Sequence, residues 1–172
     1  TGTVIARHPK KMNRTRLLFG LMAFLFFSSC GSDALFRQDQ DTPNGWNLKD
    51  TLRFSLDKTI ESPSDIYIHL RNNQEYPFSN IFLVVGLRAG DSLIEQDTLE
   101  YAMAKPNGEW LGTGYSSIKE SKLWWKSNWQ TTDTTLYHFD IAQANRANGL
   151  EEGAEQLAGI ISVGLSIETR TK

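Results

Sequence analysis

The segment NIFLVVGL, residues 80–87, decides the fold that this sequence predicts. It is almost wholly apolar and rich in β-branched side chains, which is typical of a strand covered on both faces. The segments around it alternate apolar and polar residues, the pattern of a strand with one buried face. They are TLRFSLD (51–57), DIYIHL (65–70), DTLEYAMA (97–104), TLYHFDIA (135–142) and IISVGLSIE (160–168).

Short turn signals separate these segments. They are Ser62-Pro63-Ser64, Ala89-Gly90-Asp91, Pro106-Asn107-Gly108 and Asn148-Gly149. Six or more short strands spaced in this way predict an all-β fold, an antiparallel β-sandwich of jelly-roll or immunoglobulin-like type. Helix signals are weak, and we expect only one or two short helical turns, around residues 118–123, 142–149 or 151–159.

A different pattern precedes the predicted domain in RTRLLFGLMAFLFFSSC, residues 14–30. Two arginines stand before residues 17–27, which carry no charged or polar side chain. A membrane-spanning helix needs about 20 apolar residues, so this shorter stretch predicts a cleaved secretory signal. Its positive region would begin at Met12, and we interpret residues 1–11 as an upstream extension that the signal does not need.

The residues before the only cysteine, Phe27-Ser28-Ser29-Cys30, resemble a bacterial lipobox, with Phe27 in place of the more usual leucine. In lipoproteins this cysteine becomes the first residue and carries the acyl chains, and two or more chains anchor a protein stably. We therefore expect lipidation at Cys30, with residues 1–29 removed. The alternative is that Cys30 is an ordinary buried cysteine.

Cleavage before Cys30 would leave an acylated tether and one domain. We assign the tether to residues 30–47, which are polar and end near the turn pair Asn44-Gly45, and the β-sandwich domain to residues 48–172. Leu35 and Phe36 are the only apolar pair in the tether, and they could pack on the domain as a short first strand.

Charge argues against two classes of partner. The whole chain has a formal net charge of −2, but residues 1–29 hold five basic and no acidic side chains, so the mature part would carry −7. Nucleic-acid binding needs a basic stripe, and electrostatic attraction to anionic lipid headgroups also needs basic residues. With Cys30 acylated, no thiol would remain for a disulfide or a metal.

The sequence carries none of the familiar catalytic motifs. It has no Gly-x-Ser-x-Gly elbow, no phosphate-binding glycine loop and no His-Glu-x-x-His. His69 and His138 lie in predicted strands on the face opposite the apolar set, and with Asp140 they could meet as metal ligands. A metal site needs three or four converging ligands, so two solvent-facing histidines are the simpler interpretation. We expect no enzyme activity, no metal and no cofactor.

Four aromatic residues, Trp110, Tyr115, Trp124 and Trp125, form a candidate interaction surface for a protein or a glycan. Gly108, Gly112 and Gly114, which lie near Trp110 and Tyr115 in the sequence, allow close backbone approach or positive φ. The competing interpretation is that Trp110 and one of the two adjacent tryptophans cap the core of a small domain. Adjacent residues of a strand point to opposite faces, so one of the two tryptophans should lie outside the core.

Four segments together resemble the GldH family of gliding-motility lipoproteins, from about residue 34 to residue 168. They are YIHLRNNQEYPFSNIFLVV (67–85), DTLEYAMAKPNGEWLGTG (97–114), IKESKLWWK (118–126) and LAGIISVGLSIE (157–168). The resemblance implies a non-enzymatic lipoprotein of the cell envelope that is needed for gliding motility. It also implies an association with the machinery that supports type IX secretion, with envelope proteins as partners.

Only Cys30 transfers from the family as a functional residue. Gly31 follows it, without the aspartate that retains some lipoproteins at the inner membrane, so we expect an outer-membrane location. A second hypothesis is a glycan-binding β-sandwich lipoprotein, which predicts coplanar aromatic rings along one face or groove. A third, a hydrolase, lacks any visible arrangement of acid, base and nucleophile.

Overall fold

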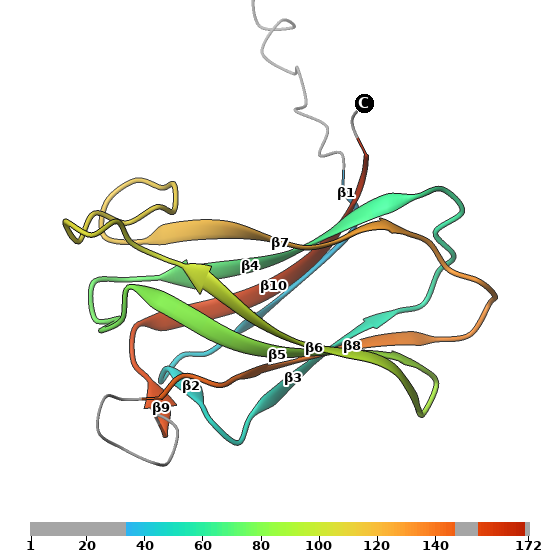
Figure 1. Ribbon diagram of the computed structural model, residues 1–172, viewed down its shortest axis with the longest axis horizontal. Helices are drawn as coiled ribbons and strands as arrows, with labels where there is room; N and C mark the ends of the chain where they lie inside the picture. The colour runs from blue at the N-terminus through green and yellow to red at the C-terminus, as the bar shows by residue number, and fades with distance from the viewer. Residues whose placement is uncertain (1–33, 147–154, 171–172) are drawn as a thin grey trace, which may run out of the picture. The chain divides into compact units, whose positions relative to one another are not determined.

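The computed structural model describes residues 34–146 and 155–170, which belong to one compact unit. These residues form two four-stranded sheets and a two-stranded ribbon (Figure 1). The strands are β1 (Ala34–Asp41), β2 (Trp46–Asn47), β3 (Thr51–Leu56), β4 (Ser64–Asn72), β5 (Asn80–Ala89), β6 (Ser92–Ala102), β7 (Lys119–Trp129), β8 (Tyr137–Gln143), β9 (Gln156–Leu157) and β10 (Ile160–Thr169). The predicted all-β antiparallel sandwich is confirmed.

The first sheet has the order β1-β10-β4-β7, and the second has the order β3-β8-β5-β6. All neighbouring strands run antiparallel. Side-chain contacts place the β1 edge beside the β3 edge, because Gln40 Nε2 donates to Arg53 O at 2.7 Å. They place the β7 edge beside the β6 edge, because the Tyr101 hydroxyl donates to Trp124 O at 2.6 Å. Thus β7 and β6 border the same side of the sandwich.

The core contains the side chains that the alternating pattern assigns to one face of each strand. These buried residues include Phe54, Leu56, Ile66, Ile68, Leu70, Met103, Tyr137, Phe139, Ile141, Val163, Leu165 and Ile167. Trp129 closes one part of the core, with its ring edge-to-face against Tyr137 and Phe139 at centroid distances of 5.5 Å. Burial of these large apolar side chains supplies the main driving force for folding.

Coverage of β5 differs from the prediction. Ile81, Leu83 and Val85 are fully buried, whereas Phe82 and Val84 on the other face are only half-buried. The prediction of two covered faces is wrong here, because side chains of neighbouring strands shield the outer face of β5 only in part. β10, in contrast, buries both faces over much of its length.

The ordered domain begins earlier than residue 48. β1 spans Ala34–Asp41 and pairs with β10 along its length, so most of the predicted tether belongs to the first sheet. Trp46, also assigned to the tether, is fully buried in the core. Leu35 and Phe36 do take part in a first strand, and that strand is longer than the sequence indicated.

The helical turns do not appear in the described residues. One turn was expected around residues 118–123, but residues 119–123 belong to the long strand β7, which spans Lys119–Trp129. Tertiary pairing with β4 explains this, because alternate residues Leu123 and Trp125 pack into the core. The turns expected at 142–149 and 151–159 fall partly on residues 147–154, outside the described residues. The described parts of these two segments contain the end of β8 and the whole of β9.

Candidate functional site

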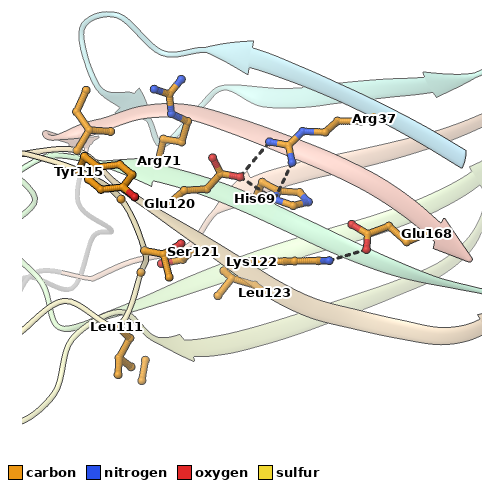
Figure 2. Close-up of a pocket in the computed structure, with 15 residues that line it drawn as sticks. Arg37, His69, Arg71, Leu111, Tyr115, Glu120, Ser121, Lys122, Leu123 and Glu168 are labelled. Carbon is orange, nitrogen blue, oxygen red and sulfur yellow. Dashed lines mark hydrogen bonds and ion pairs between the residues drawn. The ribbon is translucent and has the colours of Figure 1, made fainter. Parts of the chain in front are cut away.

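A groove of about 1010 Å³ opens where the outer face of the first sheet meets the free edge of β7. We call it the edge groove. Its walls are residues 111–115 of the β6–β7 connection and residues 120–123 of β7, together with Arg37, His69, Arg71, Ala102, Ile118 and Glu168 (Figure 2). Four consecutive strand residues include side chains of both faces, so the groove passes around the edge of β7.

The β6–β7 connection lies very close to β7. Thr113 exchanges two main-chain hydrogen bonds with Glu120, of 2.9 and 2.7 Å. A Cβ atom at Gly112 would lie 2.9 Å from the main-chain oxygen of Glu120, so a side chain at this position would push the connection away. The prediction that the glycines of GEWLGTGY permit close approach is therefore confirmed at Gly112, and this approach shapes one wall of the groove.

A hydrogen-bonded network, which we call the His69 network, consists of the groove residues Arg37, His69, Glu120, Lys122 and Glu168 together with the buried Ser166. Its members come from β1, β4, β7 and β10, the four strands of the first sheet. Arg37 Nη1 lies 3.3 Å from His69 Nδ1, and Arg37 Nη2 donates to Glu120 at 3.1 Å. The network therefore ties the whole width of the sheet together.

Burial fixes the protonation of His69, which is 3% exposed. Desolvation lowers the pKa of His69, and the positive charge of Arg37 lowers it further, so the imidazole is neutral at pH 7. Because the Ser166 hydroxyl donates its proton to Glu168, it must accept from the imidazole, so we assign the proton to Nε2, which donates to Ser166 Oγ at 2.8 Å; Nδ1 then accepts from Arg37. Ser166 Oγ in turn donates to Glu168 at 2.9 Å.

Lys122 completes the network at the other end. Its Nζ donates to Glu168 at 2.5 Å and also lies 4.2 Å from the centre of the Tyr67 ring. Burial alone would raise the pKa of Glu168, but the hydrogen bonds from Lys122 and Ser166 outweigh it and lower the pKa. Glu168 is therefore a carboxylate at neutral pH, and its two oxygens are both engaged.

Ser166, His69 and Glu120 are the residue types of an acyl-transfer triad, and His69 Nδ1 lies 3.2 Å from a Glu120 oxygen. Accessibility argues against that chemistry. Ser166 is 0% exposed in the middle of β10, and its hydroxyl proton is directed to Glu168 rather than to the imidazole. A nucleophile must reach the substrate carbonyl, and Ser166 does not; its hydrogen bonds instead link His69 of β4 with Glu168 of β10.

The structure separates the four aromatic residues of the predicted surface. Tyr115 is 99% exposed on the wall of the edge groove, and Trp124 is 53% exposed on the outer face of β7. Trp125 is 5% exposed and donates to Asp97 at 2.9 Å, so it belongs to the core. Trp110 is half-buried and packs against the Tyr76 ring at 6.1 Å. The adjacent tryptophans do point to opposite faces, as expected.

The surroundings of the two histidines differ from those that the sequence predicts. His69 lies on the face opposite the core, as expected, but it is buried rather than solvent-facing. His138 is half-buried and contacts Ser55 Oγ at 2.9 Å. Asp140 accepts hydrogen bonds from Arg53 and Arg88, at 2.6 and 3.0 Å, and does not join a histidine. Within residues 34–146 and 155–170, no three potential ligands converge to hold a metal.

Cys30, the predicted lipidation site, lies outside the described residues. In the part of the chain that the structure describes, no helix is long and apolar enough to span a membrane.

Sequence reasoning missed most of the His69 network. Arg37, Glu120, Lys122 and Ser166 are single polar residues on alternating strands, and no motif or spacing marks them. Only His69, as a histidine in an otherwise apolar strand, gave a signal. The positions of the other members become visible once the strand register is known.

The fold and the site define a class: a β-sandwich domain with a polar groove along one strand edge. Comparison with known proteins gives the family. Residues 34–167 match the model of the GldH lipoprotein family. The chain belongs to this family, and the resemblance noted in its sequence is confirmed.

Two relatives extend the match over nearly the whole chain. A protein of Christiangramia forsetii named "Gliding motility lipoprotein GldH homolog" is 39% identical over 159 residues, covering 89% of this chain and 97% of that protein. The "Gliding motility lipoprotein GldH" of Flavobacterium johnsoniae is 34% identical over 152 residues, covering 87% and 94%.

Among solved structures, the VP2 subviral particle of infectious bursal disease virus matches with a TM-score of 0.26 and 13% identity. The match covers 82% of this chain and 40% of that one. A likeness this low carries no argument.

Proposed function

We propose that this protein is a cell-envelope lipoprotein required for gliding motility, and that it acts by binding other envelope proteins of the gliding and type IX secretion apparatus. The observation that carries the proposal is the family match over residues 34–167, with relatives that are named for gliding motility. The acyl chains on Cys30 hold it in the membrane, and Gly31 after the cysteine favours the outer membrane.

The start of β1 limits how far the domain can stand from its anchor. Ala34 is already paired with Glu168 in the first sheet. An extended chain spans at most about 3.3–3.6 Å per residue. The Cα atom of Ala34 therefore lies within about 14 Å of the Cα atom of Cys30. A connection this short keeps the start of β1 close to the lipid surface when Cys30 is acylated.

The domain acts without catalysis in this proposal. The burial of Ser166 and the engagement of its hydroxyl by Glu168 support this view. The accessible polar groups of the edge groove suit recognition of another chain, because they combine charged side chains with the open main chain of an edge strand.

The test compares Cys30→Ala with the matched control Ser28→Ala, which keeps a small residue in the lipobox. Each variant replaces the native gene in a gliding host, and palmitate labelling, membrane fractionation and colony spreading are measured. The alanine variant of Cys30 should lose the label, leave the membrane fraction and fail to spread, whereas the Ser28 variant behaves as wild type. A Cys30→Ala protein that remains membrane-bound and supports spreading would contradict the proposal.

The alternative function, glycan binding, rests on the exposed rings of Trp124 and Tyr115. Flat aromatic side chains can stack on sugar rings, but Trp110 and Trp125 are now assigned to packing. A glycan array probed with wild type and with Trp124→Ala tests this function. Binding that the substitution abolishes supports it, and a wild-type protein that binds no glycan on the array rules it out.

A further inference from the structure

We propose that the edge groove binds an extended segment of a partner protein, which adds as a strand to the free edge of β7 and places a carboxylate against Arg71. This inference rests on the proposed function, action through protein partners, and it names the site and the kind of ligand. Three features of the described residues carry it: the orientation of the β7 main chain, the charge of the groove and the alternation of its walls.

The main chain of β7 is open at Lys122. Both main-chain groups of Glu120 bond to Thr113, on the side away from β4, and Trp124 O accepts from the Tyr101 hydroxyl on that same side. Main-chain groups of alternate strand residues point in the same direction. The N–H and C=O of Lys122 therefore also face the free edge, and within the described residues neither is bonded across it.

On the opposite side of the sandwich, side-chain contacts cover the edges of β1 and β3, whereas the β7 edge is only partly covered. Between β1 and β3, Gln40 Nε2 donates to Arg53 O at 2.7 Å, and Gln38 accepts from Ser55 N at 3.4 Å. Lys58 Nζ also donates to Leu35 O. Such side-chain contacts protect an edge from pairing with another chain. On β7, Thr113 covers the edge at Glu120 and Tyr101 covers it at Trp124. The main chain of Lys122, between these two positions, is left open.

Charge specifies the ligand further. Arg37 is shared between Asp39 and Glu120, and Lys122 pairs with Glu168. Arg71 lines the same groove and is exposed, and within the described residues its guanidinium makes no hydrogen bond or ion pair (Figure 2). An arginine binds a carboxylate with two parallel hydrogen bonds, so an acidic side chain is the complementary group.

The two walls of the groove fit the alternation of a strand. Arg71 and Lys122 lie on the outer face of the first sheet, whereas Ala102 at the end of β6 and Leu111 of the β6–β7 connection line the groove from the other side, with Leu123 of β7 facing the core. Leu111 is also an exposed large apolar side chain. Successive side chains of an added strand would point to these two walls in turn. The expected ligand is therefore an extended segment in which acidic and apolar residues alternate.

The test uses the full acylated chain in detergent micelles and a phage-displayed library of random nonapeptides as the probe. Selected peptides are titrated against wild type, Arg71→Glu, Lys122→Pro and the charge-reversal control Lys49→Glu, whose side chain is exposed away from the groove. Proline removes the outward N–H of residue 122. Thermal unfolding of each variant checks that it is folded, and amide hydrogen exchange of the wild type with peptide reports which main-chain groups become protected.

We expect acidic peptides that lose at least tenfold in affinity on Arg71→Glu and on Lys122→Pro but not on Lys49→Glu, with new protection at residues 122 and 124. If Lys122→Pro is unfolded, Arg71→Glu and the exchange data decide. A selection that yields no peptides, or peptides that bind all variants alike, overturns the inference. A wild-type dimer that Lys122→Pro dissociates overturns it in favour of a second copy of this chain as the occupant.

Failure of this inference and failure of the proposed function give different results in cells. Arg71→Glu and Lys122→Pro should keep the acyl label and the membrane fraction but lose colony spreading. Normal spreading of both variants, in a host that cannot spread without the protein, overturns the inference about the edge groove but leaves the proposed function standing. Normal spreading without the protein contradicts the proposed function itself.

Discussion

The imidazole Nε2 of His69 lies 2.8 Å from the hydroxyl oxygen of Ser166, although the two residues are 97 positions apart in the sequence. Both side chains are buried on the outer face of a sheet, where an apolar covering layer would be the usual neighbour. The pair is the centre of a network that spans the sheet from β1 to β7. It is therefore the natural place to measure what the outer face contributes to stability.

Replacing His69 should be costly. In His69→Ala the Ser166 oxygen loses the N–H that it accepts and keeps only its own bond to Glu168, and Arg37 loses one of its acceptors. The loss of a buried hydrogen-bonding partner costs about 1–3 kcal/mol. We expect a decrease of that size in the free energy of unfolding, measured by urea denaturation. His138→Ala is the control, because His138 is only half-buried and makes one contact with Ser55. Equal losses for the two variants would contradict a special role of the network.

Stability should also depend on pH through His69. Its pKa in the folded protein is lowered, mainly by burial, from the value of about 6.5 that an unfolded histidine has. Between those two pKa values the unfolded chain binds more protons than the folded one, so acid favours unfolding. The free energy of unfolding should fall as the pH decreases from about 7.5 towards the folded pKa. His69→Asn should flatten this part of the profile, and an unchanged slope in the variant would show that another group titrates there.

The adjacent tryptophans should respond differently to truncation. Trp125 packs against Phe139, with ring centroids 6.1 Å apart, and its indole nitrogen is bonded to Asp97. Trp125→Ala should lower the free energy of unfolding by about 3–5 kcal/mol, whereas Trp124→Ala should change it by less than about 1 kcal/mol, because its ring is half in solvent. Denaturation followed by circular dichroism measures both. A larger loss for Trp124 would mean that the outer face of β7 is covered.

Gly112 should not tolerate a side chain. A Cβ atom there would lie 2.8 Å from Ser121 Oγ and 2.9 Å from the Glu120 carbonyl oxygen. Overpacking of this kind costs about 1–3 kcal/mol, and the displaced connection should exchange its amide protons faster around Thr113. Gly86→Ala is the matched control in a strand, because its new Cβ atom would make an ordinary contact with Leu93. Similar exchange at Thr113 in both variants would show that the connection does not depend on the close approach.

The alternation of apolar and polar residues predicted the strands, because one face of each strand packs into the core. This requirement can be read from the residues of each strand alone. Phe54, Ile68 and Phe139 could therefore be assigned to the core from sequence alone. β1 was placed in a tether because ALFRQDQD is mostly polar; its strand identity comes from pairing with β10 and from contacts that involve Arg37 and Asp39. The prediction of a helical turn near residue 118 was also wrong because of tertiary pairing: the pairing of β7 with β4 overrides a weak local preference.

The site was less predictable than the fold. The spacing of Arg37, His69, Glu120 and Ser166 in the chain carries no information about their meeting, which follows from strand order and register. The exposure of Trp124 rather than Trp125 depends on the same register. The open edge at Lys122 results from where the β6–β7 connection ends its pairing, a feature without a signature in composition.

The lipid anchor is the part of this account on which the proposed function depends most. Intact-mass spectrometry of the native protein, purified from membranes in mild detergent, tests it most directly. We predict a polypeptide that begins at Cys30 and carries the added mass of acyl chains on that residue. An amino terminus upstream of Cys30 without any lipid mass would contradict the account.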